Sequence, residues 1–347
     1  MAGAVPPLPR SLPDPLPQVC VSQSAIAAPS PTRSRRAGGA LGDKVFAAFA
    51  VASGVLVLVL LGAIIVSLFV GGLPSFRAFG LGFLASADWD PVQEVYGAAV
   101  PIFGTIVTSV LALIMAVPLA FGIAFYLTEL APPWLRRPIG TAIELLAAVP
   151  SIIYGMWGFF VIVPVMADTI EPHIIDTFDG IPLLQDLFAG PPFGTGLFTA
   201  ALILAVMVIP FIAATMRDVF LTVPAVYKES AYGVGCTTWE VMRSIVLPYT
   251  RASVVGGIML GLGRALGETM AVTFVIGNTN RITANLFGSG NTIASLVALE
   301  FGESENGSLK LSSLLALGFI LFVISFIVLA ISRLLLRPRG ASAGARA

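Results

Sequence analysis

Charged residues are scarce in this sequence. Asp, Glu, Lys and Arg together make up 11% of the 347 residues, and the mean hydropathy is +0.94. Soluble globular proteins carry about 25% charged residues, so the composition indicates a protein that resides in a lipid bilayer. The formal net charge is zero, whereas a nucleic-acid-binding domain would present a basic field. We therefore expect no nucleic-acid partner.

Histidine, cysteine and lysine are also rare. The single histidine, His173, lies in an acidic stretch, and the two cysteines, Cys20 and Cys236, have neither CxxC spacing nor a neighbouring histidine. These residues predict no disulfide framework, no metal site and no cofactor. None of the three lysines follows a glycine, so the GxxxxGK[ST] phosphate-binding loop of ATPases is absent. An ATP-driven function would need a partner chain.

Long apolar runs dominate what is present. A helix that crosses a bilayer needs about 20 mostly apolar residues, and six stretches reach that length, near 45–71, 99–127, 140–166, 197–216, 252–276 and 312–335. The predicted fold class is therefore all-α, a polytopic membrane protein with six transmembrane helices. Pro150 and Pro210 should interrupt or kink the third and fourth stretches. Residues 1–42, rich in Pro, Ala and Ser, predict a disordered cytoplasmic tail.

The positions of Lys and Arg predict the orientation of these helices. Basic residues gather before the first stretch, in alternate loops and after the last stretch: Arg33, Arg35, Arg36, Lys44, Arg136, Arg137, Arg217, Lys228, Arg243, Arg251, Arg333, Arg337, Arg339 and Arg346. The other three loops are acidic and contain only Arg77, Arg281 and Lys310. By the positive-inside rule, we expect both termini to be cytoplasmic.

The predicted cytoplasmic loop 217–251 is too long for a simple connection. Thr222 with Pro224 predicts the start of a short helix, and Gly235 predicts its end. The segment 237–240 has the spacing of a capping box, which predicts that a second short helix begins there. Two short helices joined at a glycine turn would form a compact knob that can dock on another protein.

The second of these helices should run toward Pro248, and the whole loop matches a known pattern. Glu-Ser-Ala at 229–231, a glycine at 235 and Ile-x-Leu-Pro at 245–248 resemble the EAA loop of bacterial ABC importer permeases, with Ser in place of Ala at the second position. The resemblance implies that seven residues couple the chain to an ATPase subunit: Glu229, Ser230, Ala231, Gly235, Ile245, Leu247 and Pro248. An ordinary amphipathic hairpin at the membrane surface is the alternative.

Two charges lie inside the fifth apolar stretch. Arg264 follows Arg251 by thirteen residues, about 20 Å along a helix and near the bilayer midplane. A charge there costs about 2.5–3.5 kcal/mol on insertion scales, and Glu268, four residues on, would share the same helix face. A polar pathway between subunits or a static ion pair would explain both. Two glycine pairs should let a neighbouring helix approach closely: Gly257 with Gly261, and Gly263 with Gly267.

The stretch from Gly263 to Val272 is similar to the signature of phosphate-specific ABC importer permeases. Pro150–Gly158, with Trp157, resembles the third-helix motif of their C-type subunit. That family carries Arg264 and Glu268 as residues needed for transport, and a guanidinium suits phosphate because its planar donor fork stays charged. We add three hydroxyls as pathway candidates. Ser151 and Tyr154 could instead bond carbonyls freed at the Pro150 kink, and Thr269 could instead serve helix packing. Glu144 is predicted to be a snorkelling or cavity carboxylate rather than a proton relay.

The resemblance covers residues 96–335, an expected transmembrane domain of type I ABC importer permease fold. Residues 43–95 add a first helix and outer loop, and 336–347 a cytoplasmic tail. The resemblance implies a non-enzymatic permease subunit of an ATP-driven phosphate importer in the bacterial cytoplasmic (inner) membrane. Its implied partners are an A-type permease subunit in a heterodimer, two ATPase subunits and an extracytoplasmic phosphate-binding protein.

Three other functions remain open from the sequence. The chain could be an ABC permease for another solute, such as sulfate or molybdate, or a secondary transporter or channel that works without an ATPase. An intramembrane enzyme is disfavoured, because no His–Ser, His–Glu or paired-Asp constellation lies within the six stretches.

Overall fold

The structure is a computed structural model that describes residues 40–178, 180–188 and 190–335. Most of the predicted disordered tail, 1–42, and the C-terminal tail, 336–347, lie outside the described residues; residues 40–42 are helical. The chain divides into two units at Val59. The described part of the first unit is the beginning of helix α1, and everything from Leu60 onward belongs to the second unit.

Within the described residues, six helices are long and apolar enough to cross a bilayer, which confirms the predicted number of spans. They cover Gly42–Phe79, Ala99–Leu130, Ser151–Phe178, Leu197–Leu221, Thr238–Leu266 and Leu309–Leu334. Four of them are built on one long α-helix each: α1 (Ala40–Phe79), α3 (Ala99–Phe125), α9 (Leu197–Leu221) and α15 (Leu309–Leu335).

The third and fifth spans are composite. The third contains three α-helical pieces joined by two π-helical turns: α5 (Ser151–Trp157), η2 (Gly158–Ile162), α6 (Val163–Val165), η3 (Met166–Ile170) and α7 (Glu171–Phe178). The fifth contains one π-helical turn between two α-helical pieces: α11 (Thr238–Val241), η4 (Met242–Val246) and α12 (Leu247–Leu266).

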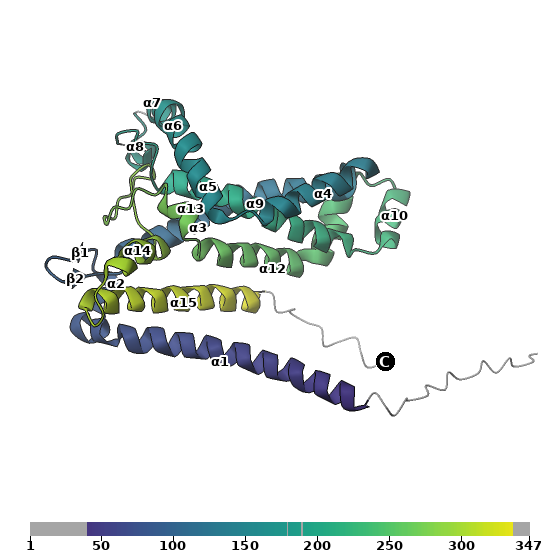
Figure 1. Ribbon diagram of the computed structural model, residues 1–347. Helices are drawn as coiled ribbons and strands as arrows, with labels where there is room; N and C mark the ends of the chain where they lie inside the picture. Colours follow the sequence, from purple (N-terminus) through teal and green to yellow (C-terminus); the bar gives the residue numbers. More distant parts are fainter. Residues whose placement is uncertain (1–39, 179, 189, 336–347) are drawn as a thin grey trace, which may run out of the picture. The chain divides into compact units, whose positions relative to one another are not determined.

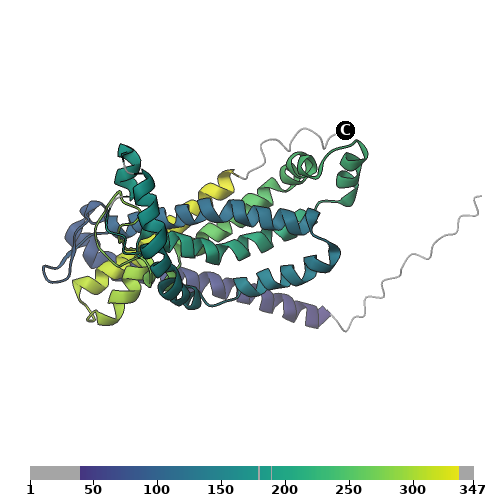
Figure 2. The ribbon, with the colours of Figure 1, turned by 90° about the horizontal axis from the view of Figure 1, so that it is seen from above.

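Shorter elements complete the chain. At one end of the second unit are η1 (Tyr126–Leu130), α4 (Pro133–Ala147) and α10 (Ala225–Gly233). Toward the opposite end are α2 (Gly82–Ala85), α8 (Pro182–Phe188), α13 (Met270–Thr273), α14 (Ile293–Glu300) and the 3₁₀ turn η5 (Phe301–Glu303). Figures 1 and 2 show α10 and α14 at opposite ends.

A two-stranded antiparallel hairpin departs from the all-α expectation. Strands β1 (Trp89–Asp90) and β2 (Val95–Tyr96) pair Trp89 with Tyr96 and Asp90 with Val95. Each strand has two residues, so the hairpin is a short local element of the loop between the first two spans. The described fold is otherwise helical.

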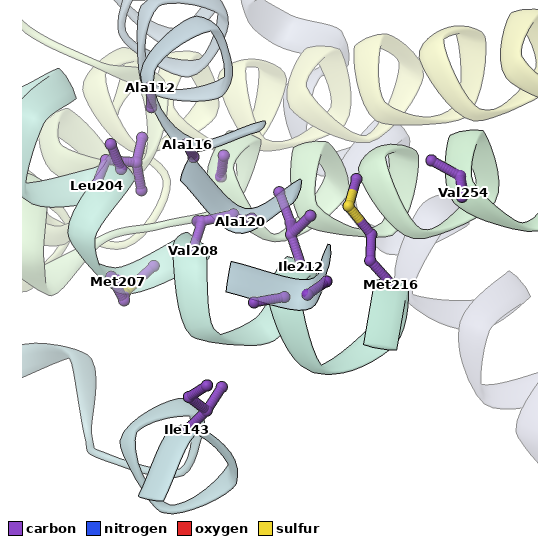
Figure 3. Packing of buried hydrophobic residues seen from close by; sticks show 14 of the residues in the cluster. Ala112, Ala116, Ala120, Ile143, Leu204, Met207, Val208, Ile212, Met216 and Val254 are labelled. Atoms are coloured by element: carbon purple, nitrogen blue, oxygen red, sulfur yellow. The ribbon is translucent and has the colours of Figure 1, made fainter. Parts of the chain in front are cut away.

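The main hydrophobic core lies between α3 and α9. Four alanines recur every fourth residue on one face of α3 and are fully buried: Ala112, Ala116, Ala120 and Ala124. They belong to the same cluster as Leu204, Val208 and Ile212 of α9 (Figure 3). Small residues let helix backbones approach closely in a membrane, where packing rather than water exclusion drives association.

The fifth span packs on α9 through its first glycine pair. A Cβ added to Gly257 would lie 2.8 Å from Thr215 Cγ2, and one added to Gly261 would lie 2.8 Å from Ile212 Cδ1. This confirms the predicted close approach for that pair. Gly263 has nothing within 4 Å, and Gly267 meets only the carbonyl of its own helix at 3.8 Å. The second pair therefore makes no close helix contact among the described residues.

Three span predictions need correction. The segment predicted at 140–166 is split by Ala148–Pro150, so α4 is a separate helix and the span starts at Ser151. Pro150 disfavours the helical conformation of the residue before it, which explains the break. The fifth span covers Thr238–Leu266 rather than 252–276. Pro210 does not interrupt α9, because a proline within a buried helix can kink it without ending it.

Candidate functional site

The fifth span breaks where its charged residues lie. Helix α12 ends at Leu266, α13 begins at Met270, and Glu268 falls in the non-helical link between them. The Glu268 Oε1 atom accepts a 3.4 Å hydrogen bond from the backbone N–H of Ala271 in the first turn of α13. Glycine at 267 weakens the helix at this point. The expectation that Arg264 and Glu268 share one helix face is therefore wrong.

Arg264 lies in the last turn of α12 and is exposed. Of the four ion pairs that join described residues, none involves Arg264 or Glu268. The alternative of a static ion pair between these two residues is therefore contradicted in this structure. A guanidinium without a protein partner keeps its donor fork available for an anion.

A second broken helix lies against this link. After the break at Pro150, the phenol of Tyr154 donates a 2.9 Å hydrogen bond to the carbonyl of Leu146, at the end of α4. Tyr154 therefore bonds a carbonyl across the helix break, the alternative role considered for it from the sequence. Ser151 is partly exposed, and its side chain makes no hydrogen bond recorded among the described residues.

Glycine brings the two broken helices into contact. A Cβ on Gly155 of α5 would lie 2.9 Å from Ala271 Cα and 2.9 Å from Phe274 Cδ2, so any larger residue would push α5 away from α13. Thr269 is placed differently: it lines a mostly apolar cavity of about 350 Å³ with residues of α14 and α15.

The predicted knob is present at the other end of the second unit. Helix α10 ends at Gly233, and Gly235 has a φ of +92°, a conformation that only glycine adopts without strain. The capping box is confirmed: the Thr237 N–H donates to Glu240 Oε2 at 2.7 Å, and the Glu240 N–H donates to Thr237 Oγ1. Thr222 does not start α10; it closes α9, and its hydroxyl donates to the carbonyl of Val219.

The second helix of the knob is not short. It continues through Pro248 into α12, so the expectation that it ends near that proline is wrong. Pro248 lies inside this continuous helix, where it lacks the N–H that an α-helical turn would use, and the π turn η4 directly precedes it. The knob is therefore the first turns of the fifth span together with α10.

The seven predicted coupling residues divide by exposure. Those on the surface are Glu229, Ser230, Gly235 and Pro248; those buried or partly buried are Ala231, Ile245 and Leu247. Ile245 and Leu247 pack against the chain's own core, and Ala231 is part of it. Only the first group is available to a partner. Exposed apolar side chains adjoin it, and the sequence analysis did not single them out: Val226, Tyr227 and Val234.

Two further features fix the knob to the body. Lys228 Nζ and Glu129 Oε1 form a 2.6 Å ion pair, and their side chains are 16% and 8% exposed. The indole of Trp239 packs edge-on against Phe121 and Phe125 of α3, with ring centroids 6.5 and 5.9 Å apart. The pair joins residues 99 positions apart, so no local sequence pattern could have found it.

Comparison with known proteins gives the family. The sequence model of the family described as "Binding-protein-dependent transport system inner membrane component" matches residues 116–339. This chain belongs to that family. Two curated relatives are both called "Phosphate transport system permease protein PstC". The one from Mesorhizobium japonicum is 57% identical over 306 residues, which cover 88% of this chain and 93% of the relative. The one from Pasteurella multocida is 61% identical over 282 residues, or 81% and 88% of the two chains.

Two solved structures support the fold. A chain of a bacterial alginate ABC transporter, solved in complex with an alginate pentasaccharide-bound periplasmic protein, aligns with a TM-score of 0.57 at 15% identity, over 85% of this chain and 94% of that one. A chain of the MetNI methionine ABC transporter aligns with a TM-score of 0.50 at 16% identity, over 71% and 99%. The chain is therefore a multi-pass inner-membrane transport component with an ABC importer permease fold.

Proposed function

We propose that this chain is the transmembrane permease subunit of an ATP-driven importer of inorganic phosphate and forms half of its translocation pathway. The observation that supports phosphate as the transported solute is the 57% identity to a relative named as a phosphate transport permease, over 88% of the chain. The geometry agrees, because Arg264 lies exposed in the last turn of α12, at a break in the span, and makes no ion pair with any described residue. Among the proposed pathway residues, Arg264 is the phosphate contact, and Tyr154 and Ser151 lie on α5, which packs against α13 on the other side of the break.

The proposed coupling surface is the exposed part of the knob. Glu229 and Ser230 on α10 adjoin the apolar side chains Val226, Tyr227 and Val234, which water alone would cover in the isolated chain. An ATPase subunit would bury them, because a small apolar patch rimmed by polar residues is typical of a protein interface. ATP hydrolysis would then reside in a pair of such partner subunits.

The proposed orientation puts α10 in the cytoplasm. The end of the second unit near α10 carries Arg136, Arg137, Lys228 and Arg243, whereas acids dominate the end near α14 and the hairpin. By the positive-inside rule, the basic end is cytoplasmic. An extracytoplasmic phosphate-binding protein would then dock at the acidic end, and an A-type permease would cover the free face of α12 around Gly263.

Uptake measurements test the proposal. In a strain lacking this gene, uptake of radiolabelled phosphate should fall, and expression of the chain should restore it. Sulfate and molybdate uptake, measured in the same cells, serve as controls and should not change. Normal phosphate uptake together with loss of another solute would show a different cargo.

Co-purification tests the partners separately. From membranes solubilised in mild detergent, the chain should bring down an ATPase subunit and a second permease chain. Purification of the chain alone, with transport that persists when ATP is depleted, would contradict the proposal and favour a secondary transporter.

A further inference from the structure

A pocket of about 370 Å³ lies at the end of the second unit that carries α10. It is formed by the end of η1, the first turns of α4 and the end of α9, and is lined by Leu127, Thr128, Arg136, Arg137, Thr141, Glu144, Arg217 and Leu221. Its volume falls within the range of about 300–1,000 Å³ typical of small-molecule sites. Arg264 does not line it, so it is separate from the proposed transport contact.

One arginine of the pocket is held rigidly. Arg217 Nη2 bonds Glu144 Oε1 at 2.6 Å and Asp218 Oδ1 at 2.9 Å, and its side chain is 18% exposed. Its other terminal nitrogen lies directly over Gly140 of α4, where a Cβ would collide with it. Arg217, Glu144 and Asp218 together carry a net charge of −1, so Arg217 joins α4 to α9 and supplies no free positive charge to the pocket.

The other two arginines supply the free positive charge. Arg136 uses only its Nε, which donates to the carbonyl of Ala131 at 2.7 Å, so both terminal nitrogens remain available. Arg137 is exposed and makes no ion pair among the described residues. Thr141, one turn further along α4, adds a hydroxyl. Two adjacent guanidinium groups and a hydroxyl are donors suited to the oxygens of a phosphate group.

The surroundings of the pocket are apolar. A second cavity of about 440 Å³ shares Glu144 with it and continues along α4 and α9. Four apolar residues line it, Ala147, Phe211, Ala214 and Val219, together with Thr215, Asp218 and Thr222. Trp134 of α4 is 75% exposed, and aromatic residues of this kind concentrate at membrane interfaces. A basic pocket that opens onto an apolar groove matches a phosphate headgroup followed by an acyl chain.

We propose that the pocket between η1, α4 and α9 binds a phosphate group through Arg136, Arg137 and Thr141, and that an anionic phospholipid carries this group. The adjoining groove then takes one acyl chain. Basic pockets between transmembrane helices on the cytoplasmic side commonly bind anionic headgroups. Free inorganic phosphate offers the same oxygens without the acyl chain, and the experiment separates the two sources.

Native mass spectrometry of the assembled transporter tests the lipid arm. The complex is purified in micelles that contain equal amounts of phosphatidylglycerol and phosphatidylcholine, and the retained lipids are counted. We expect preferential retention of phosphatidylglycerol. The double substitution Arg136→Gln/Arg137→Gln should lower it at least about tenfold, the size expected for loss of one charge-assisted hydrogen bond. The matched control is Arg333→Gln, an exposed arginine of α15 that does not line the pocket.

Binding of radiolabelled phosphate in phosphatidylcholine nanodiscs tests the other arm. It is measured in an Arg264→Gln background, with and without the double substitution. Phosphate binding that requires Arg136 and Arg137, without selective lipid retention, would support the phosphate site and assign it to free phosphate. Arg137→Gln alone is the folding control: it leaves the Arg136–Ala131 hydrogen bond intact, so a loss of binding in this variant does not come from the loss of that bond. Equal phosphatidylglycerol retention in all variants, with no arginine-dependent phosphate binding, would overturn the proposal.

Discussion

The ion-paired charges near α10 differ from the charges at the break between α12 and α13, which form no ion pair with any described residue. Near α10, ion pairs fasten helices together: Lys228 bonds Glu129, and Arg217 bonds Glu144. At the break, Arg264 makes no ion pair with any described residue, and Glu268 only caps a short helix. Both regions carry ionisable groups in a membrane protein, where such groups are costly.

The difference separates structural charges from functional ones. A paired charge stabilises the fold, and its removal leaves the partner buried and unsatisfied. An unpaired charge stabilises nothing in the isolated chain, so its presence is explained by something the chain does not contain, such as a substrate or a partner helix. Substitutions should therefore damage stability at the ion-paired residues near α10 and transport at the break.

The largest effect is expected at Arg264. Arg264→Gln should lower the initial rate of phosphate uptake by at least about a hundredfold, because two charge-assisted hydrogen bonds of about 1.5–3 kcal/mol each are lost. Assembly should be unchanged, since Arg264 has no ion-pair partner among the described residues to leave unsatisfied. Uptake in cells and the elution volume of the purified complex measure the two effects.

Arg264→Lys and Arg281→Gln are the controls for that result. Lysine keeps the charge and loses the planar fork, so we expect partial uptake. Arg281 is an exposed arginine of an outer loop and should tolerate the change. If Arg264→Gln makes the complex dissociate, the arginine has a structural role toward the second permease. The distinction between structural charges near α10 and functional charges at the break would then be wrong.

The next effect is expected at Glu129. Glu129→Gln leaves Lys228 without its partner, and breaking a buried ion pair costs about 3–5 kcal/mol. We expect about 2–3 kcal/mol here, because the Lys228 side chain is still 16% exposed. The melting temperature of the purified complex should fall. Glu129→Gln combined with Lys228→Met should recover part of the loss, whereas an unaltered melting temperature in the single variant would show that the pair contributes no stability.

Gly155 allows a smaller perturbation of the break itself. Gly155→Ala places a Cβ 2.9 Å from a backbone atom of α13, and overpacking of this kind costs about 1–3 kcal/mol. Since α5 would move away from α13, phosphate uptake should fall several-fold, with protein levels retained. The matched control is Gly122→Ala on α3, where nothing lies within 4 Å of the added Cβ. Equal uptake in both variants would show that the α5–α13 contact does not position the pathway.

The sequence predicted features that arise from local chemistry or from composition. Six spans followed from apolar length, the break at Pro150 from proline stereochemistry, and the cap at Thr237 from the spacing of two polar residues. It failed where the outcome depends on tertiary contacts. Pro210 leaves α9 continuous, whereas the span with no proline near Glu268 breaks.

The partners of individual charges were also beyond the sequence. Glu268 stands four residues from Arg264, which in a continuous helix would make them neighbours, but its carboxylate caps the next helix instead. Lys228 and Arg217 find partners 99 and 73 positions away. Such pairs depend on how α3, α4 and α9 pack, which no local pattern records.

The smallest effect is expected at Gly235, beside the paired charges. Its φ of +92° disfavours any residue with a Cβ, but nothing lies within 4 Å of the position that a Cβ would occupy. Gly235→Ala should therefore cost only the backbone term of about 1–2 kcal/mol, because no collision adds to it. We expect a slightly lower melting temperature and weaker retention of the ATPase subunit on co-purification, since α10 would turn relative to Thr237.

Gly233→Ala, also without a neighbour within 4 Å but lacking a positive φ, should have no effect. A large loss of ATPase binding with an unchanged melting temperature would instead mean that the partner contacts this turn directly, which would make Gly235 part of the docking surface rather than its support.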